Sequence, residues 1–328
     1  MFDILFLMTP YSINYIMKSK LVLIISPADD LHAQVVAKML TDRQIWFEWI
    51  DLRDLNQNLQ NSYNVGDTIG SRLVTSTGKV VESQDILSVW WRRALPPIPS
   101  PTDDEYDTIF INCEWLQFIE QLESFIPAKW VNLPSHNRAA KPKGRQLQIA
   151  QQVGLKIPQT LITNHPLEVI DFADRGMPQI YKGMGEGKGK STGTKTLQPN
   201  DLDRLGSLQY CPAIFQEKIE ARLDIRVTAI GGVLYPVEIE SQTGYSPLDW
   251  RFDHDVPFNP HTLDPTIDRQ LKQLLERLGL IYGAIDLRLT PDGEYVFLEV
   301  NPNGQYLFAE ILAGIPLSEK MVDFLSQA

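Results

Sequence analysis

The sequence has few cysteines, no excess of basic residues and no long apolar run. Two cysteines in 328 residues, Cys113 and Cys211, are too few for a structural zinc site or a disulfide framework, so we expect a reduced, cytoplasmic compartment. The net charge of −11 argues against a nucleic-acid partner, which usually meets a basic surface. The five histidines are scattered, and no Ser/His/Asp or Cys/His set predicts a nucleophilic mechanism.

The first 16 residues are apolar but lack the features of a targeting segment. They have no basic start, Asp3 lies near the beginning, and no small-residue cleavage site follows. The stretch is also too short and too polar to cross a bilayer. We expect residues 1–17 to be a disordered or mis-started extension, and we expect no membrane partner.

The rest of the chain predicts a mixed α/β and α+β protein with three lobes. Strands over Lys20–Ser26, Ile45–Ile50 and Ile86–Trp91 alternate with helices over Asp30–Leu40 and Asp103–Phe125, which indicates a parallel-sheet lobe over residues 18–130. In the second helix Trp115, Leu116, Ile119 and Leu122 can share one face. Residues 131–214 and 215–328 form the central and C-terminal lobes of the prediction. Their predicted elements are a helix over Ala139–Val153, strands over Lys156–Thr163, Ala213–Glu220, Asp224–Ile230 and Val233–Ser241, a helix over Thr266–Leu278 and a hairpin of Tyr282–Leu289 and Glu294–Val300.

A glycine-rich segment in the central lobe predicts a phosphate site. Tyr181–Gly193 holds five glycines and three lysines, and glycine lets backbone N–H groups wrap an anionic oxygen. The segment is not a P-loop, because Met184 stands where the upstream glycine is required. Lys182 ends the preceding strand and suits a phosphate contact. The alternative is a surface hairpin tip without a ligand.

The predicted C-terminal hairpin brings together Asp286, Glu299 and Asn301. If Asp292 and Gly293 form a two-residue turn, Asp286 lies opposite Glu299, and the period of two places Asn301 on the same face, with Arg288 beside Asp286. Two carboxylates and an amide oxygen suit Mg²⁺, which shares its shell with phosphate oxygens and water. A solvated strand face is the alternative.

A third signal is weaker. Phe215–Glu220, followed by Asp224–Val227, can offer backbone groups to an adenine edge and a carboxylate to a ribose. Alone, this segment is equally typical of a charged edge strand.

Taken in order, these signals resemble the ATP-grasp superfamily over about residues 130–328. The resemblance implies an ATP-grasp fold in which a parallel-sheet lobe precedes two α+β lobes that enclose ATP and Mg²⁺. It implies phosphate or adenine contacts for Lys143 and Lys182, with Lys141 competing for the first role, and phosphate contacts for Gly185, Gly187 and Gly189. It further implies adenine contacts for Glu217 and Ile219, a ribose contact for Asp224, and Mg²⁺ ligation by Asp286, Glu299 and Asn301.

From Met17 onward, segments such as SVWWRR, DIRVTAIGG and LEVNPNGQYLF resemble the microviridin-type (graspetide) ribosomal peptide maturases. That resemblance implies an ATP-dependent ligase that activates Asp or Glu side chains of a leader-bearing ribosomal precursor peptide and forms ω-ester or ω-amide crosslinks. Arg226, Arg251 and Arg288 are candidates for stabilising the tetrahedral intermediate. A ligase for a free amino acid or small peptide, and a nucleotide-regulated peptide-binding module without turnover, are the alternatives. The oligomeric state stays open between a monomer and a homodimer.

Overall fold

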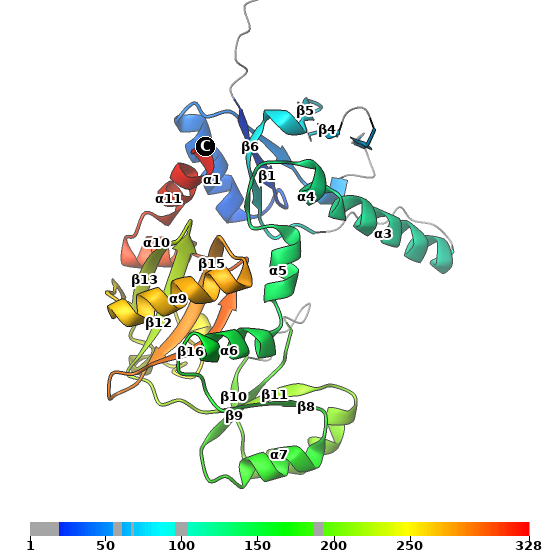
Figure 1. Ribbon diagram of the computed structural model, residues 1–328. Coiled ribbons are helices and arrows are strands. Elements are labelled where there is room, and N and C mark those ends of the chain that lie inside the picture. The colour runs from blue at the N-terminus through cyan, green and yellow to red at the C-terminus, as the bar shows by residue number, and fades with distance from the viewer. Residues whose placement is uncertain are drawn as a thin grey trace, which may run out of the picture.

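The computed structural model describes residues 20–54, 61–66, 69–75, 77–95, 104–185 and 193–327. The extension predicted for residues 1–17, and Gly187 and Gly189 of the glycine-rich segment, lie outside these residues. Figure 1 shows three lobes in a row, with the N-terminal lobe at one end, the lobe of residues 160–217 at the other, and a five-stranded sheet between them.

The N-terminal lobe is built on a parallel sheet, as its alternating strand and helix patterns predict. Four strands pair in the order β2-β1-β6-β7, and every pairing is parallel. The elements are β1 (Leu21–Ile25), α1 (Leu31–Asp42), β2 (Phe47–Ile50), β6 (Ile86–Trp91) and β7 (Lys129–Val131). β1 is buried along its whole length, which explains its uninterrupted apolar sequence. Asp30 begins α1 by accepting a hydrogen bond from the amide of Ala33.

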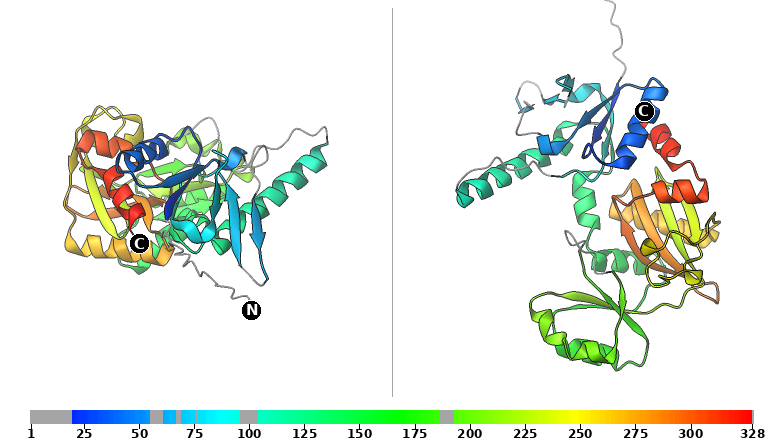
Figure 2. Two further views of the ribbon diagram at one scale, coloured as in Figure 1. Left: turned by 90° about the horizontal axis from the view of Figure 1, so that it is seen from above. Right: turned by 180° about the vertical axis from the view of Figure 1, so that it is seen from behind.

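Two features of this lobe differ from the prediction. An antiparallel sheet of β3 (Ser62–Asn64), β4 (Gly70–Val74) and β5 (Val80–Glu82) has no counterpart in it. The helix expected over Asp103–Phe125 is divided into α3 (Glu105–Glu120) and α4 (Leu122–Phe125), and α3 projects from the lobe (Figures 1 and 2). Leu116 is 46% exposed while Ile119 and Leu122 are buried. The prediction that these residues share one apolar face was therefore wrong for Leu116.

The central lobe is a small antiparallel sheet covered on one side by helices. The strands pair in the order β10-β9-β11-β8, with β8 (Thr160–Thr163), β9 (Gln179–Lys182), β10 (Lys195–Thr196) and β11 (Ala213–Glu217). α7 (Pro166–Ala173), α8 (Pro199–Leu202) and a 3₁₀ helix over Leu205–Gln209 accompany them. β11 pairs with both β8 and β9, so the boundary predicted after residue 214 falls inside a strand that belongs to this sheet.

The C-terminal lobe carries the largest sheet of the described chain, in the order β14-β13-β12-β15-β16. Its strands are β12 (Leu223–Ile230), β13 (Val233–Ile239), β14 (Phe258–Pro260), β15 (Tyr282–Leu289) and β16 (Tyr295–Asn301). The helix expected over Ala139–Val153 is two helices, α5 (Pro134–Ala140) and α6 (Lys143–Gln152), because the backbone is extended at Pro142. α6 and α9 (Pro265–Leu278) bury apolar residues against one face of this sheet.

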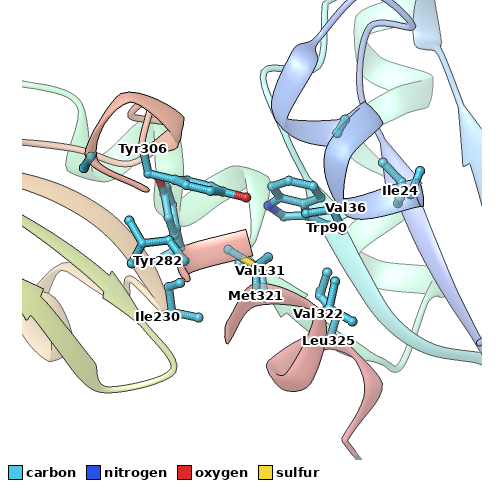
Figure 3. Packing of buried hydrophobic residues seen from close by; sticks show 14 of the residues in the cluster. Ile24, Val36, Trp90, Val131, Ile230, Tyr282, Tyr306, Met321, Val322 and Leu325 are labelled. Carbon is cyan, nitrogen blue, oxygen red and sulfur yellow. The ribbon is translucent and has the colours of Figure 1, made fainter. Parts of the chain in front are cut away.

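A shared core joins the first and last lobes. α11 (Leu317–Ser326) lies beside α1, and α10 (Leu307–Ala313) lies next to it along the chain (Figures 1 and 2). Figure 3 shows the Tyr306 ring pointing toward Trp90 of β6, with Met321 and Val322 of α11 nearby. The end of β6 is therefore packed directly against the chain that follows β16.

The β15–β16 hairpin has the predicted pairing of Asp286 with Glu299, but its turn differs from the predicted one. Asp286 lies opposite Glu299 as predicted, but the turn is longer, since the backbone N–H of Thr290 donates to the carbonyl of Glu294. Gly293 has φ of 87°, as a three-residue turn that ends in a left-handed residue requires. A bulge at Leu298 then shifts the pairing back by one residue.

Candidate active site

The three predicted metal ligands line one cavity. Asp286 on β15, Glu299 on β16 and Asn301 at the end of β16 all border a space of about 290 Å³. Asp286 and Glu299 are opposite partners in the register, and Asn301 follows two residues later on the same face. The hairpin therefore brings together the oxygen atoms that the sequence pattern singles out.

Each carboxylate of this cavity is paired with a cation from another element. Lys143, the first residue of α6, places its Nζ 2.7 Å from Oε2 of Glu299. Arg226 on β12 lies opposite Asp286 in the sheet and donates from one nitrogen to both of its carboxylate oxygens, at 2.9 and 2.8 Å. Lys143 rather than Lys141 therefore reaches the site, since Lys141 is exposed at the end of α5.

Burial and neighbouring charge move the pKa values of these groups in different directions. Burial alone would raise the pKa of Glu299, but the charges of Lys143 and Lys182 outweigh it and lower the pKa to about 2. For Asp286, burial outweighs the pairing with Arg226 and raises the pKa of the carboxyl. Burial lowers the pKa of Lys182, partly offset by the charge of Glu299. Such shifts in opposite directions are common where charged ligands are bound.

The donor set fits a hard divalent cation. Within the described residues no group of three or more His, Cys, Asp and Glu side chains could hold a metal. Two carboxylates and an amide oxygen on one cavity wall suit Mg²⁺, which keeps part of its shell for water and phosphate oxygens. Asp286, Glu299 and Asn301 would hold the ion, and this assignment stays a prediction.

Three of the predicted nucleotide residues lie together at a second cavity. Lys182, Glu217 and Ile219 line a second, smaller cavity of about 50 Å³, which Leu298 of the bulge also borders. Lys182 ends β9 and Glu217 ends β11, so the central lobe supplies this wall. Gly185, where the described part of the glycine-rich segment ends, is exposed. The nucleotide contacts of these residues stay predictions.

Asp224 and Arg288, predicted as a ribose contact and a catalytic cation, are buried partners of each other. The Arg288 Nε lies 3.1 Å from Oδ1 of Asp224, and the Ser241 hydroxyl donates to Oδ2 of Asp224. Arg288 also donates to the backbone carbonyls of Ile219, Pro247 and Leu248. Both side chains are buried, and Arg288 also borders the smaller cavity that Lys182, Glu217 and Ile219 line. The predicted roles of Asp224 and Arg288 stay predictions. The pair fixes the connection between β11 and β12.

The other two predicted arginines do line the larger cavity. Arg226 is held by Asp286 and by the carbonyl of Gln305. Arg251 makes two hydrogen bonds to Asp249, at 2.7 and 2.6 Å, and remains about half exposed. Their catalytic roles stay predictions, and both guanidiniums are positioned by carboxylates.

The sequence patterns missed several residues of this cavity. Its further lining residues are Arg93, Trp250, His254, Asn303, Gln305 and Phe308. Asn303 and Gln305 follow Asn301 within five residues. Their closeness in the sequence to a predicted ligand is a signal that could have identified them. Arg93 comes from the N-terminal lobe, and nothing in the local pattern predicts that β6 ends beside this cavity.

No protein-family model matches this sequence, and no curated protein sequence matches it either. Solved structures do. The macrocyclase MdnC of Microcystis aeruginosa MRC, bound with precursor peptide MdnA, is 28% identical with a TM-score of 0.83 over 94% of this chain and 100% of that chain. A Chryseobacterium gregarium RiPP-associated ATP-grasp ligase, in complex with ADP and a leader and core peptide, is 27% identical with a TM-score of 0.82 over 93% and 96%. The macrocyclase MdnB of Microcystis aeruginosa MRC is 28% identical with a TM-score of 0.77 over 93% and 99%.

These likenesses confirm the predicted ATP-grasp fold and the prediction of an ATP-dependent ligase. The lobe order agrees, with a parallel sheet first and two α+β lobes after it. Among the described residues, no helix has the length and apolar character needed to cross a bilayer.

Proposed function

We propose that this chain is an ATP- and Mg²⁺-dependent ligase that crosslinks Asp or Glu side chains within a ribosomal precursor peptide. The observation that carries the proposal is the cavity in which Asp286, Glu299 and Asn301 meet Arg226 and Arg251. The macrocyclase and RiPP-ligase neighbours, whose structures contain precursor, leader or core peptides, support the peptide as substrate class. We place the reaction in the cytoplasm, where Cys113 and Cys211, both free, would stay reduced.

The first step we propose transfers the γ-phosphoryl group of ATP to a side-chain carboxylate of the peptide. One carboxylate oxygen forms the new bond to phosphorus, and ADP leaves with the electrons of the broken bond. Lys143 and Lys182 would hold the phosphates, and Asp286, Glu299 and Asn301 would hold Mg²⁺, which offsets charge on the transferring group when it is bound. The chain's own contribution is to fix these groups, because four different elements supply them.

In the second step a Ser or Thr hydroxyl, or a Lys amine, of the same peptide attacks the activated carbonyl carbon. The bond between that carbon and the phosphate oxygen breaks, phosphate leaves, and the nucleophile loses its proton. Negative charge gathers on the carbonyl oxygen in between, and Arg226 and Arg251 are the lining guanidiniums that can stabilise it. A leader segment that favours the competent state of the enzyme would raise the rate without joining the chemistry.

Mass spectrometry of a peptide incubated with the enzyme tests the proposal. Two peptides serve as probes. One is the precursor MdnA, and the other is a short peptide encoded beside this gene, where one rich in Thr, Asp and Glu is present. Each crosslink should remove one water, about 18 Da, and consume one ATP by the acyl-phosphate chemistry. Hydroxylamine should divert the activated carboxylate to a hydroxamate. ATP-dependent ligation of free amino acids, with neither peptide dehydrated, would move the function to a small-molecule ligase.

A further inference from the structure

The cavity of about 290 Å³ has more cations on its wall than the proposed chemistry has used. Arg93, Arg226 and Arg251 all line it. Arg226 is held by both oxygens of Asp286, and Arg251 is held by both oxygens of Asp249. Arg93 is exposed, and its guanidinium has no hydrogen bond or ion pair with any residue that the structure describes. Of the three lining arginines, Arg93 is therefore the one that has no carboxylate partner among the described residues and can accept an incoming anion.

The backbone at Arg93 is also unusual. Its φ is 48°, a left-handed conformation that costs a non-glycine residue about 1 kcal/mol or more. Gln44, with φ of 56°, is the other such residue among those described, and it follows α1, where a left-handed residue commonly ends a helix. Arg93 follows a strand and ends no helix. A strained conformation that presents a free side chain to a cavity is typical of a functional residue.

The preceding residue explains how this conformation is maintained. Arg92 is buried, and its guanidinium donates to the carbonyls of Asn303 and Gly304 at 2.8 Å each. Its backbone N–H donates to Ile25 in the adjacent strand. Trp90, two residues earlier, packs in the core that Tyr306 joins (Figure 3). The end of β6 is thus anchored to the loop that follows Asn301 and carries Asn303, which leaves Arg93 at the cavity.

We propose that Arg93 binds the substrate carboxylate that is to be activated. This inference rests on the proposed function. A guanidinium is suited to a carboxylate because its two parallel N–H groups match the two oxygens. The phosphates of ATP are the other available anion. Of the two lysines expected to bind them, Lys143 contacts Glu299 on the wall of this cavity, whereas Lys182 lies elsewhere. Lys182 lines the separate nucleotide-side cavity on the central lobe, and Arg93 does not border that cavity.

Three variants separate this role from a structural one. Arg93→Gly removes the guanidinium and relieves the backbone strain, Arg93→Lys keeps the charge without the paired N–H geometry, and Gln44→Gly relieves the same strain away from the cavity. Both glycine variants should keep or raise the melting temperature. Arg93→Gly should raise the KM for the precursor peptide at least about tenfold with the KM for ATP unchanged, as loss of a charged hydrogen bond predicts. Arg93→Lys should recover part of the loss, and Gln44→Gly should change neither KM.

A second arm uses the same peptide with its reactive Asp or Glu replaced by Asn or Gln, as a competitive inhibitor. Wild-type enzyme should bind the acid about tenfold or more tightly than the amide, and Arg93→Gly should lose this discrimination. A discrimination that survives in Arg93→Gly, or an equal rise in the KM for ATP, would overturn the role of Arg93. If wild-type enzyme dehydrates no peptide, the proposed function itself falls, so the two failures are distinguished by the wild-type reaction.

Discussion

Replacing Glu299 with Gln separates the charge of this residue from its shape. Gln keeps an oxygen that can accept a hydrogen bond from Lys143, which lies 2.7 Å from the carboxylate, but it removes one of the two negative charges expected to hold Mg²⁺. Loss of one fixed electrostatic contact at a reacting centre typically lowers kcat by about 10²- to 10³-fold. We expect a loss of at least this size for the peptide reaction.

The stability of the same variant can be worked out from the pKa. The pKa of Glu299 is about 2 against an ordinary 4.5, so its ionised form stabilises the fold by about 3 kcal/mol at neutral pH. This contribution is present above pH 4.5 and is lost as pH falls through 2. Because Gln retains the hydrogen bond, we expect Glu299→Gln to lose about 1–3 kcal/mol and to remain folded at pH 7.

The assay for this variant is ADP release with peptide, run beside thermal unfolding. Glu294→Gln is the matched control, because Glu294 precedes the same strand and forms an exposed ion pair with Lys156. Such a pair contributes about 1 kcal/mol or less, so the control should be close to wild type in both measurements. Turnover by Glu299→Gln at the wild-type rate would refute the metal assignment.

Two further predictions concern the contacts that hold the site together. His32 on α1 accepts hydrogen bonds from the backbone N–H groups of Tyr306 and Leu307. Burial and the charge of Arg92 lower the pKa of His32 to about 3. Between pH 6.5 and 3 the unfolded chain therefore binds a proton that the folded chain does not, and the free energy of unfolding decreases as the pH falls. Urea unfolding should show a loss of about 2 kcal/mol from this residue between pH 7 and pH 5, absent in His32→Gln; parallel pH profiles would contradict it. Arg288→Met should lower the free energy of unfolding by about 3–5 kcal/mol, because it leaves Asp224 buried without its partner. Adding Asp224→Asn should restore part of that loss. Chemical denaturation of the single and double variants measures both effects.

The fold was largely accessible from the sequence because its strands carry strong local signals. β6 and β15 begin and end at the residues that the sequence pattern predicts. The hairpin shows a limit of such reasoning. A two-residue turn predicts the pairing of Asp286 with Glu299, and the pairing is present only because a bulge at Leu298 compensates for a longer turn. A bulge depends on packing across the sheet, which periodicity does not contain.

The candidate site shows a second limit, which concerns arginine. A sequence pattern places an arginine on a strand or in a loop but does not identify the carboxylate that it meets. Arg288 is engaged by Asp224 and three carbonyl groups, Arg226 by Asp286, and Arg251 by Asp249. Arg288 and Arg226 meet carboxylates on a neighbouring strand of the same sheet, so these two pairings form only when β12 and β15 pair. Arg251 meets Asp249 two residues away.

The same reasoning explains why Arg93 was missed. Its side chain has no described partner, and its place at the cavity depends on Arg92, which reaches across to the loop after Asn301. An arginine that is already paired with a carboxylate must exchange that partner to bind a substrate, and the exchange costs part of the binding free energy. An arginine that is free and held in place by its neighbour needs no such exchange. The buried Arg92 joins the lobes, and Arg93, which has no partner among the described residues, is the residue that we propose binds the substrate carboxylate.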